Sequence, residues 1–128
     1  MNLGARLARA MAERGPLCVG IDPHPGLLDS WNLPDTAAGV REFSRTVVGE
    51  LGGTVAALKP QSAFFERHGA AGIAVLEEVL RDCRRTGVIS ILDVKRGDIG
   101  STMTAYAEAY LRPGAPLEAD AITLSPYL

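Results

Sequence analysis

The chain has 128 residues, of which 47% are hydrophobic and 22% are charged, and its formal net charge is −2. This composition predicts one globular domain with a hydrophobic core and argues against intrinsic disorder. The weak negative charge and the scattered arginines disfavour nucleic-acid binding, and no stretch approaches the ~20 apolar residues that a membrane span requires.

Helical and strand-like segments alternate along the chain. Apolar residues at helical spacing predict helices over residues 3–14, 36–51, 70–85 and 101–111, and short apolar runs predict strands over residues 17–21, 55–58, 88–92 and 119–124. Prolines and a glycine between residues 23 and 34 predict a loop. Strands separated by helices of this length imply parallel pairing. The sequence therefore predicts an α/β fold, either a parallel (β/α) barrel or an open sheet.

Two smaller features give expectations about side chains. Glu77 and Arg81 are four residues apart on a predicted helix, so we expect an ion pair between them. Cys18 and Cys83 have no Cys or His neighbour at metal-ligand spacing. We expect both thiols to be reduced and buried, as in a cytosolic protein.

The segment that follows the third predicted strand is dense in charge. Asp93, Lys95 and Asp98 lie within six residues, and Asp93 and Lys95 point to the same side if the backbone is extended. Only Lys59 and Lys95 are lysines among 13 basic residues, which indicates a need for a compact, titratable ammonium at these positions. Such a cluster can shift the pKa values of its members, as proton-transfer sites require. A solvated loop of mixed charge is the alternative.

Polar residues stand at the carboxyl end of each predicted strand. They are Asp22, Lys59, Asp93 with Lys95, and Ser125. In parallel α/β folds this is the end where active sites form. Taken alone, Asp22 or Ser125 could simply cap a turn.

Two further interpretations concern the neighbours of this segment. A divalent metal ion bridging Asp93 and Asp98 is a competing hypothesis, which Lys95 disfavours because its charge would repel the ion. Arg96 and His24 could contact a substrate, but we interpret them as a solvent-facing arginine and a loop histidine.

The stretch from Asp93 to Thr102, Asp-Val-Lys-Arg-Gly-Asp-Ile-Gly-Ser-Thr, resembles the Asp-x-Lys-x-x-Asp-Ile-x-x-Thr signature of orotidine 5′-phosphate decarboxylase. The longer bacterial subgroup of this family is the most similar. Residues 19–22, 58–61 and 123–127 also resemble the family's strand ends. The resemblance covers nearly the whole chain.

This resemblance implies a (β/α)₈ barrel, of which residues 1–128 would form the amino-terminal part of a single catalytic domain with about four βα units. It implies cytoplasmic decarboxylation of orotidine 5′-monophosphate (OMP) to UMP, in pyrimidine biosynthesis, without metal or organic cofactor. It also implies a homodimer with a shared active site. An eight-stranded barrel usually needs ~250 residues, so we expect an incomplete chain that lacks the phosphate-binding residues.

The resemblance also implies roles for the residues near the first three strand ends. Lys95 would be the general acid that protonates pyrimidine carbon 6. Asp93 would lie against the substrate carboxylate and hold Lys95. Lys59 would complete the charge network, and Lys59 and Asp22 would contact ribose hydroxyls.

Four more residues complete the implied site. Asp98 and Thr102 would reach the ribose region of the neighbouring subunit's site, and Ile99 belongs to the same signature. Ser125 would contact the pyrimidine. Two alternatives to a decarboxylase remain: a sugar-phosphate lyase of the same superfamily, which magnesium dependence would indicate, and a half-barrel assembly module without catalysis.

Overall fold

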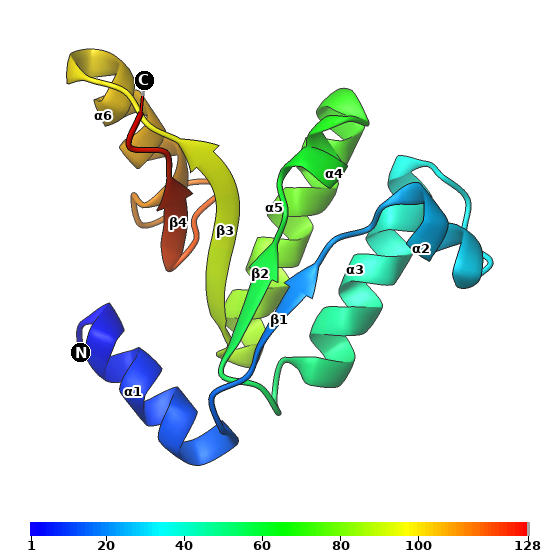
Figure 1. Ribbon diagram of the computed structural model, residues 1–128, viewed down its shortest axis with the longest axis horizontal. Coiled ribbons are helices and arrows are strands. Elements are labelled where there is room, and N and C mark those ends of the chain that lie inside the picture. Colours follow the sequence, from blue (N-terminus) through cyan, green and yellow to red (C-terminus); the bar gives the residue numbers. More distant parts are fainter. Residues whose placement is uncertain (128) are drawn as a thin grey trace.

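The computed structural model describes residues 1–127 and contains one parallel sheet flanked by helices (Figure 1). The strands are β1 (Cys18–Ile21), β2 (Ala57–Pro60), β3 (Ile89–Arg96) and β4 (Ala121–Leu124), and they lie in the order β1-β2-β3-β4. The helices are α1 (Leu3–Arg14), α2 (Pro25–Ser30), α3 (Ala37–Leu51), α4 (Ala63–Glu66), α5 (Gly69–Thr86) and α6 (Gly100–Tyr110). Every neighbouring pair of strands is parallel, which confirms the predicted α/β fold.

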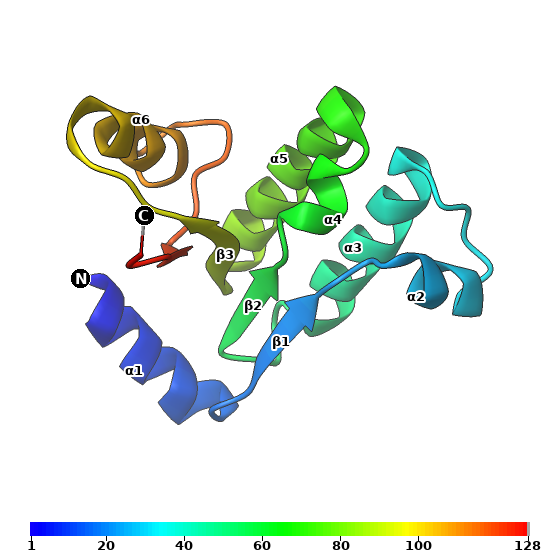
Figure 2. The same ribbon diagram turned by 45° about the horizontal axis from the view of Figure 1, so that its top comes forward.

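The hydrophobic core lies between the sheet and helices α3 and α5, which run beside each other behind β1 and β2 (Figure 2). Ile21, Leu58 and Leu92 project from three strands into this layer and are fully buried. Phe43 of α3 and Leu80 of α5 belong to the same cluster. Burial of each such side chain contributes about 1.5–3 kcal/mol, so this layer fixes the strands on which the polar residues stand.

The other face of the sheet is open around β1. Cys18 and Gly20 lie on this face and are exposed, because side chains alternate along a strand and α3 and α5 cover only the opposite face. The expectation of two buried thiols is therefore wrong for Cys18. It is confirmed for Cys83, where burial, reinforced by nearby carboxylates, raises the thiol pKa to about 12.

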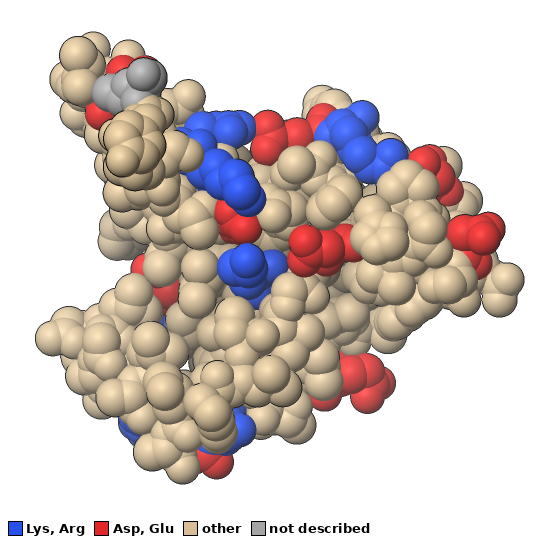
Figure 3. Space-filling view, in the orientation of Figure 1, with Lys and Arg blue, Asp and Glu red and all other residues tan. Residues whose placement is uncertain are grey.

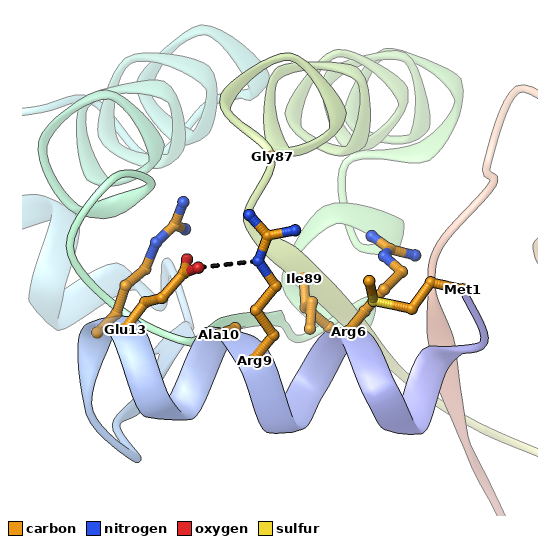
Figure 4. A pocket seen from close by; sticks show the side chains of 8 residues that line it. Met1, Arg6, Arg9, Ala10, Glu13, Gly87 and Ile89 are labelled. Atoms are coloured by element: carbon orange, nitrogen blue, oxygen red, sulfur yellow. Dashed lines mark hydrogen bonds and ion pairs between the residues drawn. The ribbon is translucent and has the colours of Figure 1, made fainter.

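Helix α1 lies at the amino ends of the strands and leaves a hollow of about 290 Å³ between itself and the start of β3 (Figure 4). Arg6, Arg9 and Glu13 line this hollow, and Arg9 donates to Glu13 at 2.8 Å. Arg6 also reaches Asp120 at 2.6 Å, and Asp120 accepts the backbone N–H of Ser90 at 2.9 Å. The hollow thus lies where α1 contacts β3 and the segment before β4. This is the opposite end of the sheet from the polar strand ends.

The segment after β1 is not wholly a loop, because it contains helix α2. Pro25 occupies the first turn, where its fixed φ suits a helix and its missing N–H costs nothing. His24 caps the helix, since its Nδ1 accepts the N–H of Leu27 at 3.2 Å. None of the helices within residues 1–127 is long and apolar enough to cross a membrane.

The shortest ion pairs of α5 run to α3, and a longer pair at 3.6 Å joins Arg85 to Asp82 along α5. Arg41 donates to Glu78 at 2.6 Å, and Arg45 donates to Asp82 at 2.7 Å. The predicted pair between Glu77 and Arg81 is wrong: among the described residues no ion pair joins these two side chains. Glu78 and Asp82 pair because their face of α5 is the one beside α3.

Candidate active site

A row of polar side chains crosses the carboxyl ends of the strands, on the face away from α3 and α5. The register places Gln61 beside Asp93, and Lys59 lies level with Gly20 on β1. Charged side chains of both signs meet over these strand ends in the middle of the view in Figure 3. The predicted gathering of Lys59, Asp93 and Lys95 at this edge of the sheet is confirmed.

The carboxylate of Asp93 is the centre of the row and receives four hydrogen bonds. Its Oδ1 accepts from Nζ of Lys95 at 2.7 Å and from Oγ1 of Thr123 at 2.7 Å. Its Oδ2 accepts from Nε2 of Gln61 at 3.0 Å and from Nζ of Lys59 at 3.4 Å. Four donors match the four lone-pair positions of an ionised carboxylate, so the group is fully satisfied although it is buried.

These contacts determine the charge of Asp93. Burial by itself would raise the pKa of this carboxyl, because it disfavours the ionised form. The hydrogen bonds from Lys95, Thr123 and Lys59 outweigh burial and lower the pKa to about 2. Asp93 is therefore a fixed negative charge at neutral pH, held between two ammonium groups.

A bulge in β3 sets the position of Lys95. Between the pairs Leu92–Ile122 and Arg96–Leu124, β3 advances four residues while β4 advances two. Lys95 has a φ of 50°, which is left-handed and unfavourable for a residue with a side chain. The ammonium of Lys95 is held by Asp93 and by Oε1 of Gln61 at 3.1 Å. Because its side chain is 61% exposed, the ammonium remains open to a ligand.

Two hydroxyl groups of the β4 segment hold the backbone of Lys95. The N–H of Lys95 donates to Oγ1 of Thr123 at 3.0 Å, and Oγ of Ser125 donates to the carbonyl of Lys95 at 3.2 Å. The loop that follows is also close to β4, since a Cβ on Gly97 would lie 2.5 Å from the carbonyl oxygen of Ser125. Ser125 thus has a structural contact, and its contact with a pyrimidine stays a prediction.

Asp22 stands at the end of β1, on the same side as Lys59. A Cβ on Gly20 would lie 2.6 Å from Oδ1 of Asp22, so the carboxylate leans back over the open face of β1. Asp22 is half-buried, and it borders the row without joining the hydrogen bonds around Asp93.

Asp98, Ile99 and Thr102 lie away from this cluster. Oδ1 of Asp98 accepts the N–H of Ile99 at 2.7 Å, at the start of α6. All three residues are exposed, and Ile99 is 73% exposed. Among residues 1–127 they therefore make no contact with the group around Asp93, and their exposed side chains can contact another molecule.

Arg96 is not the solvent-facing residue that we expected. It donates to Oε1 of Glu66 at 2.8 Å and to the carbonyl of Val94 at 2.8 Å. Burial would lower the pKa of Arg96, but the carboxylate of Glu66 raises it overall. The pair between Arg96 and Glu66 joins the end of β3 to α4. Side chains alternate along the strand, so Asp93 and Lys95 face the open side and Arg96 faces the helices.

Two members of the cluster, Gln61 and Thr123, were not among the predicted site residues. Gln61 follows Lys59 by two residues, and Thr123 precedes Ser125 by two. The alternation of a strand places both on the same face as their predicted neighbours, so this period was the available signal. Across residues 1–127 no group of three or more His, Cys, Asp and Glu side chains is arranged to hold a metal ion.

Residues 15–128 match the profile of the Orotidine 5′-phosphate decarboxylase / HUMPS family. The chain is 63% identical to orotidine 5′-phosphate decarboxylase of Salinispora arenicola over 127 residues and 62% identical to that of Streptomyces coelicolor over 125 residues. These alignments cover 99% and 98% of this chain, but 46% and 45% of the relatives. The chain thus spans about half the length of the curated relatives that it matches.

Solved structures give the same result. A crystal structure from Streptomyces avermitilis, assigned to orotidine 5′-phosphate decarboxylase, superposes with a TM-score of 0.96 at 61% identity, over 99% of this chain and 46% of that one. OMP decarboxylase of Leishmania donovani superposes with a TM-score of 0.81 at 38% identity, over 99% and 45% of the two chains. The four-stranded parallel sheet and its helices therefore have the fold of part of these enzymes.

Proposed function

Because the chain belongs to the orotidine 5′-phosphate decarboxylase / HUMPS family, we propose that its polar row is the reacting half of a site that converts OMP to UMP and carbon dioxide. The observation that carries this proposal is the arrangement of Lys59, Asp93 and Lys95, two ammonium groups on either side of one ionised carboxylate. A cofactor-independent decarboxylase needs such a charge array, because no metal or organic group is available to take up the electron pair.

The reaction develops negative charge on one carbon, and the ammonium of Lys95 would stabilise this charge. When the bond between carbon 6 and the carboxylate breaks, its electron pair stays on carbon 6 and carbon dioxide leaves. A fixed ammonium stabilises that charge more in the transition state than in the substrate. Lys95 then gives one proton to carbon 6, and the neutral amine regains a proton from water.

Asp93 and Lys59 set the electrostatics of this step. Asp93 would face the carboxylate of the substrate, and repulsion between the two negative charges is relieved as carbon dioxide leaves. The lowered pKa of Asp93 keeps it ionised for this role. Lys59 offsets part of the charge of Asp93, and Lys59 and Asp22 stand where ribose hydroxyl groups would be bound.

The remaining predicted residues are assigned to the outer parts of the site. We propose that Asp98, Ile99 and Thr102 bind the ribose region of a neighbouring subunit's substrate in a homodimer, which their exposure supports. Ser125 would contact the pyrimidine in addition to the backbone of Lys95. The free thiols of Cys18 and Cys83 support a cytoplasmic location.

We further propose that residues 1–128 are the amino-terminal part of one (β/α)₈ catalytic domain. The 45–46% share of the two curated relatives that the chain covers supports this assignment. Phosphate sites in this fold commonly come from the loops after the last two strands, which belong to the part of those relatives that this chain does not match. Both halves would then be needed, because phosphate binding energy helps to drive the reacting centre.

The test is an assay of OMP consumption by absorbance, with UMP identified by chromatography. The chain is assayed alone and together with the carboxyl-terminal half of the Salinispora arenicola relative. UMP formation by the mixture, absent from either half alone, supports a decarboxylase half-site. A stable complex that forms no UMP contradicts the proposal, and magnesium-dependent cleavage of a sugar phosphate by the same complex would indicate a lyase instead.

A further inference from the structure

We infer that Thr123 is a positioning residue whose hydroxyl group fixes the backbone of Lys95 and the carboxylate of Asp93 relative to each other. The catalytic consequence of this inference rests on the proposed function, while its structural part does not. Thr123 lies on β4, and its Oγ1 is 2.7 Å from Oδ1 of Asp93 and 3.0 Å from the backbone N of Lys95.

The bulge in β3 creates the need for such a contact. Regular pairing with β4 holds at Leu92 and returns at Arg96, so Lys95 lies in the interval where β3 carries more residues than its partner. Backbone groups in a bulge lose their regular ladder partners. The hydroxyl of Thr123 replaces the missing acceptor for the N–H of Lys95.

The direction of both hydrogen bonds follows from the charge of Asp93. An ionised carboxylate can only accept, so the single hydroxyl proton of Thr123 must be donated to Asp93. The lone pairs of Oγ1 are then available to the N–H of Lys95. The charge of Asp93 polarises the hydroxyl and so strengthens the second bond. One side chain therefore couples the anion to the backbone of the neighbouring cation.

The backbone of Lys95 requires support because its φ of 50° is unfavourable for a residue with a side chain. Its carbonyl is held as well, by Oγ of Ser125 at 3.2 Å. Thr123 and Ser125 thus fix both peptide groups of one left-handed residue. Such a conformation persists only where several surrounding contacts hold it in place.

Positioning matters here because the side chain of Lys95 is long and 61% exposed. Its ammonium must lie close enough to a substrate carbon to donate a proton to it directly. A displacement of about 1 Å in a reacting group can cost about a hundredfold in rate. An anchor at the backbone of Lys95 removes one source of that displacement.

The experiment compares Thr123→Val, which keeps the shape but removes the hydroxyl, with Thr123→Ser, which keeps the hydroxyl. Thr54→Val is the matched control, since Oγ1 of Thr54 donates only to the carbonyl of Leu51 on the surface. In the chain itself, carbon-13 NMR follows the titration of Asp93, and the amide-to-Hα coupling of Lys95 follows its φ. Steady-state kinetics use the same variants with the carboxyl-terminal half of the Salinispora arenicola relative.

We expect Thr123→Val to raise the pKa of Asp93, because one of its four donors is lost while Lys59, Lys95 and Gln61 remain. The coupling of Lys95 changes as well, kcat falls by about tenfold or more, and KM changes by less than about threefold. Thr123→Ser restores all four quantities toward the original values, and Thr54→Val changes none of them.

The inference is overturned if Thr123→Val only lowers stability and leaves the Asp93 titration and the Lys95 coupling unchanged. It is also overturned if Thr123→Ser behaves like Thr123→Val. A parent complex that does not turn over OMP would contradict the proposed function alone, because the two NMR measurements still decide the role of Thr123.

Discussion

Lys95 and Asp93 lie on the same strand with one residue between them, and Nζ of Lys95 is 2.7 Å from Oδ1 of Asp93. The intervening residue, Val94, points the other way and is buried in the core. The ammonium group and its partner carboxylate are therefore anchored by one buried side chain. Neighbouring strands add Lys59, Gln61 and Thr123, so no single loop movement can disperse the cluster.

The charge of Asp93 makes stability depend on pH at low pH. The pKa of Asp93 is about 2 in the folded chain, against 3.8 for an unperturbed aspartate, so the folded state binds this proton less tightly. The contribution is fully present above about pH 4 and is lost as pH falls through about 2. Its size is at most about 2 kcal/mol, and smaller in salt, because both ammonium groups are open to solvent.

Urea unfolding between pH 2 and pH 6 measures this contribution as the difference in free energy of unfolding between the parent chain and Asp93→Asn. Asp29→Asn, at an exposed carboxylate on α2, is the control. We expect the difference for Asp93→Asn to shrink with falling pH. A difference that grows toward pH 2 would show that the folded pKa of Asp93 is raised.

The two thiols are expected to differ in reactivity. Cys18 is exposed on the open face of the sheet, whereas Cys83 is buried and its pKa is raised to about 12. A chromogenic disulfide reagent should therefore modify one thiol per native chain, and Cys18→Ser should abolish that reaction. Cys83→Ser is the matched control and should leave it unchanged. Fast modification of Cys83 in the native chain would contradict the placement of α5.

Binding of a complementary half should protect Cys18. The face that carries Cys18 and Gly20 is the one that a closed barrel would enclose. The rate of thiol modification should then fall when the carboxyl-terminal half of a relative is added. An unchanged rate in a stable complex would show that the added half binds elsewhere.

The pair between Arg96 and Glu66 is expected to be a modest, salt-sensitive contribution to stability. Both side chains are about one-third exposed, at 32% and 38%, so Glu66→Gln should lower the free energy of unfolding by less than about 1 kcal/mol. Arg96→Met should cost more, because the carbonyl of Val94 also loses its donor. Urea unfolding at low and high salt measures both, with Glu13→Gln on α1 as the exposed control. Equal losses for the two variants would contradict the contact with Val94.

Two leucines that differ in burial should differ in how much their substitution by alanine lowers the free energy of unfolding. Leu58 is fully buried on β2, whereas Leu17, just before β1, is 59% exposed. Leu58→Ala should lower the free energy of unfolding by about 2–5 kcal/mol, and Leu17→Ala by less than about 0.5 kcal/mol. Thermal or urea unfolding gives both values. Similar losses for the two variants would contradict the burial of Leu58 and the exposure of Leu17.

Periodicity predicted most of the fold because its signals are local. The helix Leu3–Arg14 has the predicted bounds, and the parallel order of the strands followed from the alternation of elements. The helix at Pro25–Ser30 was missed because proline in a first turn looks like a loop signal in a short segment. The partners of Glu78 and Asp82 could not be predicted, because they depend on which face of α5 lies beside α3.

The charged members of the site stand out in the sequence, whereas Gln61 and Thr123 are marked only by their alternation with predicted neighbours. Lys59, Asp93 and Lys95 stand out by charge and by their place at strand ends. Gln61 and Thr123 have ordinary surface chemistry, and their importance arises from the register of neighbouring strands. The bulge at Lys95 has no sequence signal either, since the residue in the left-handed conformation is a lysine and not a glycine.

The most direct test of the account is the rate of UMP formation by the assembled complex with Lys95→Ala. Arg81→Ala, an exposed cation on α5, is the control for loss of positive charge. We predict that Lys95→Ala lowers kcat by about a thousandfold or more while the complex still assembles, and that Arg81→Ala has no effect. A Lys95→Ala complex with undiminished turnover would contradict the assignment of Lys95 as the proton donor.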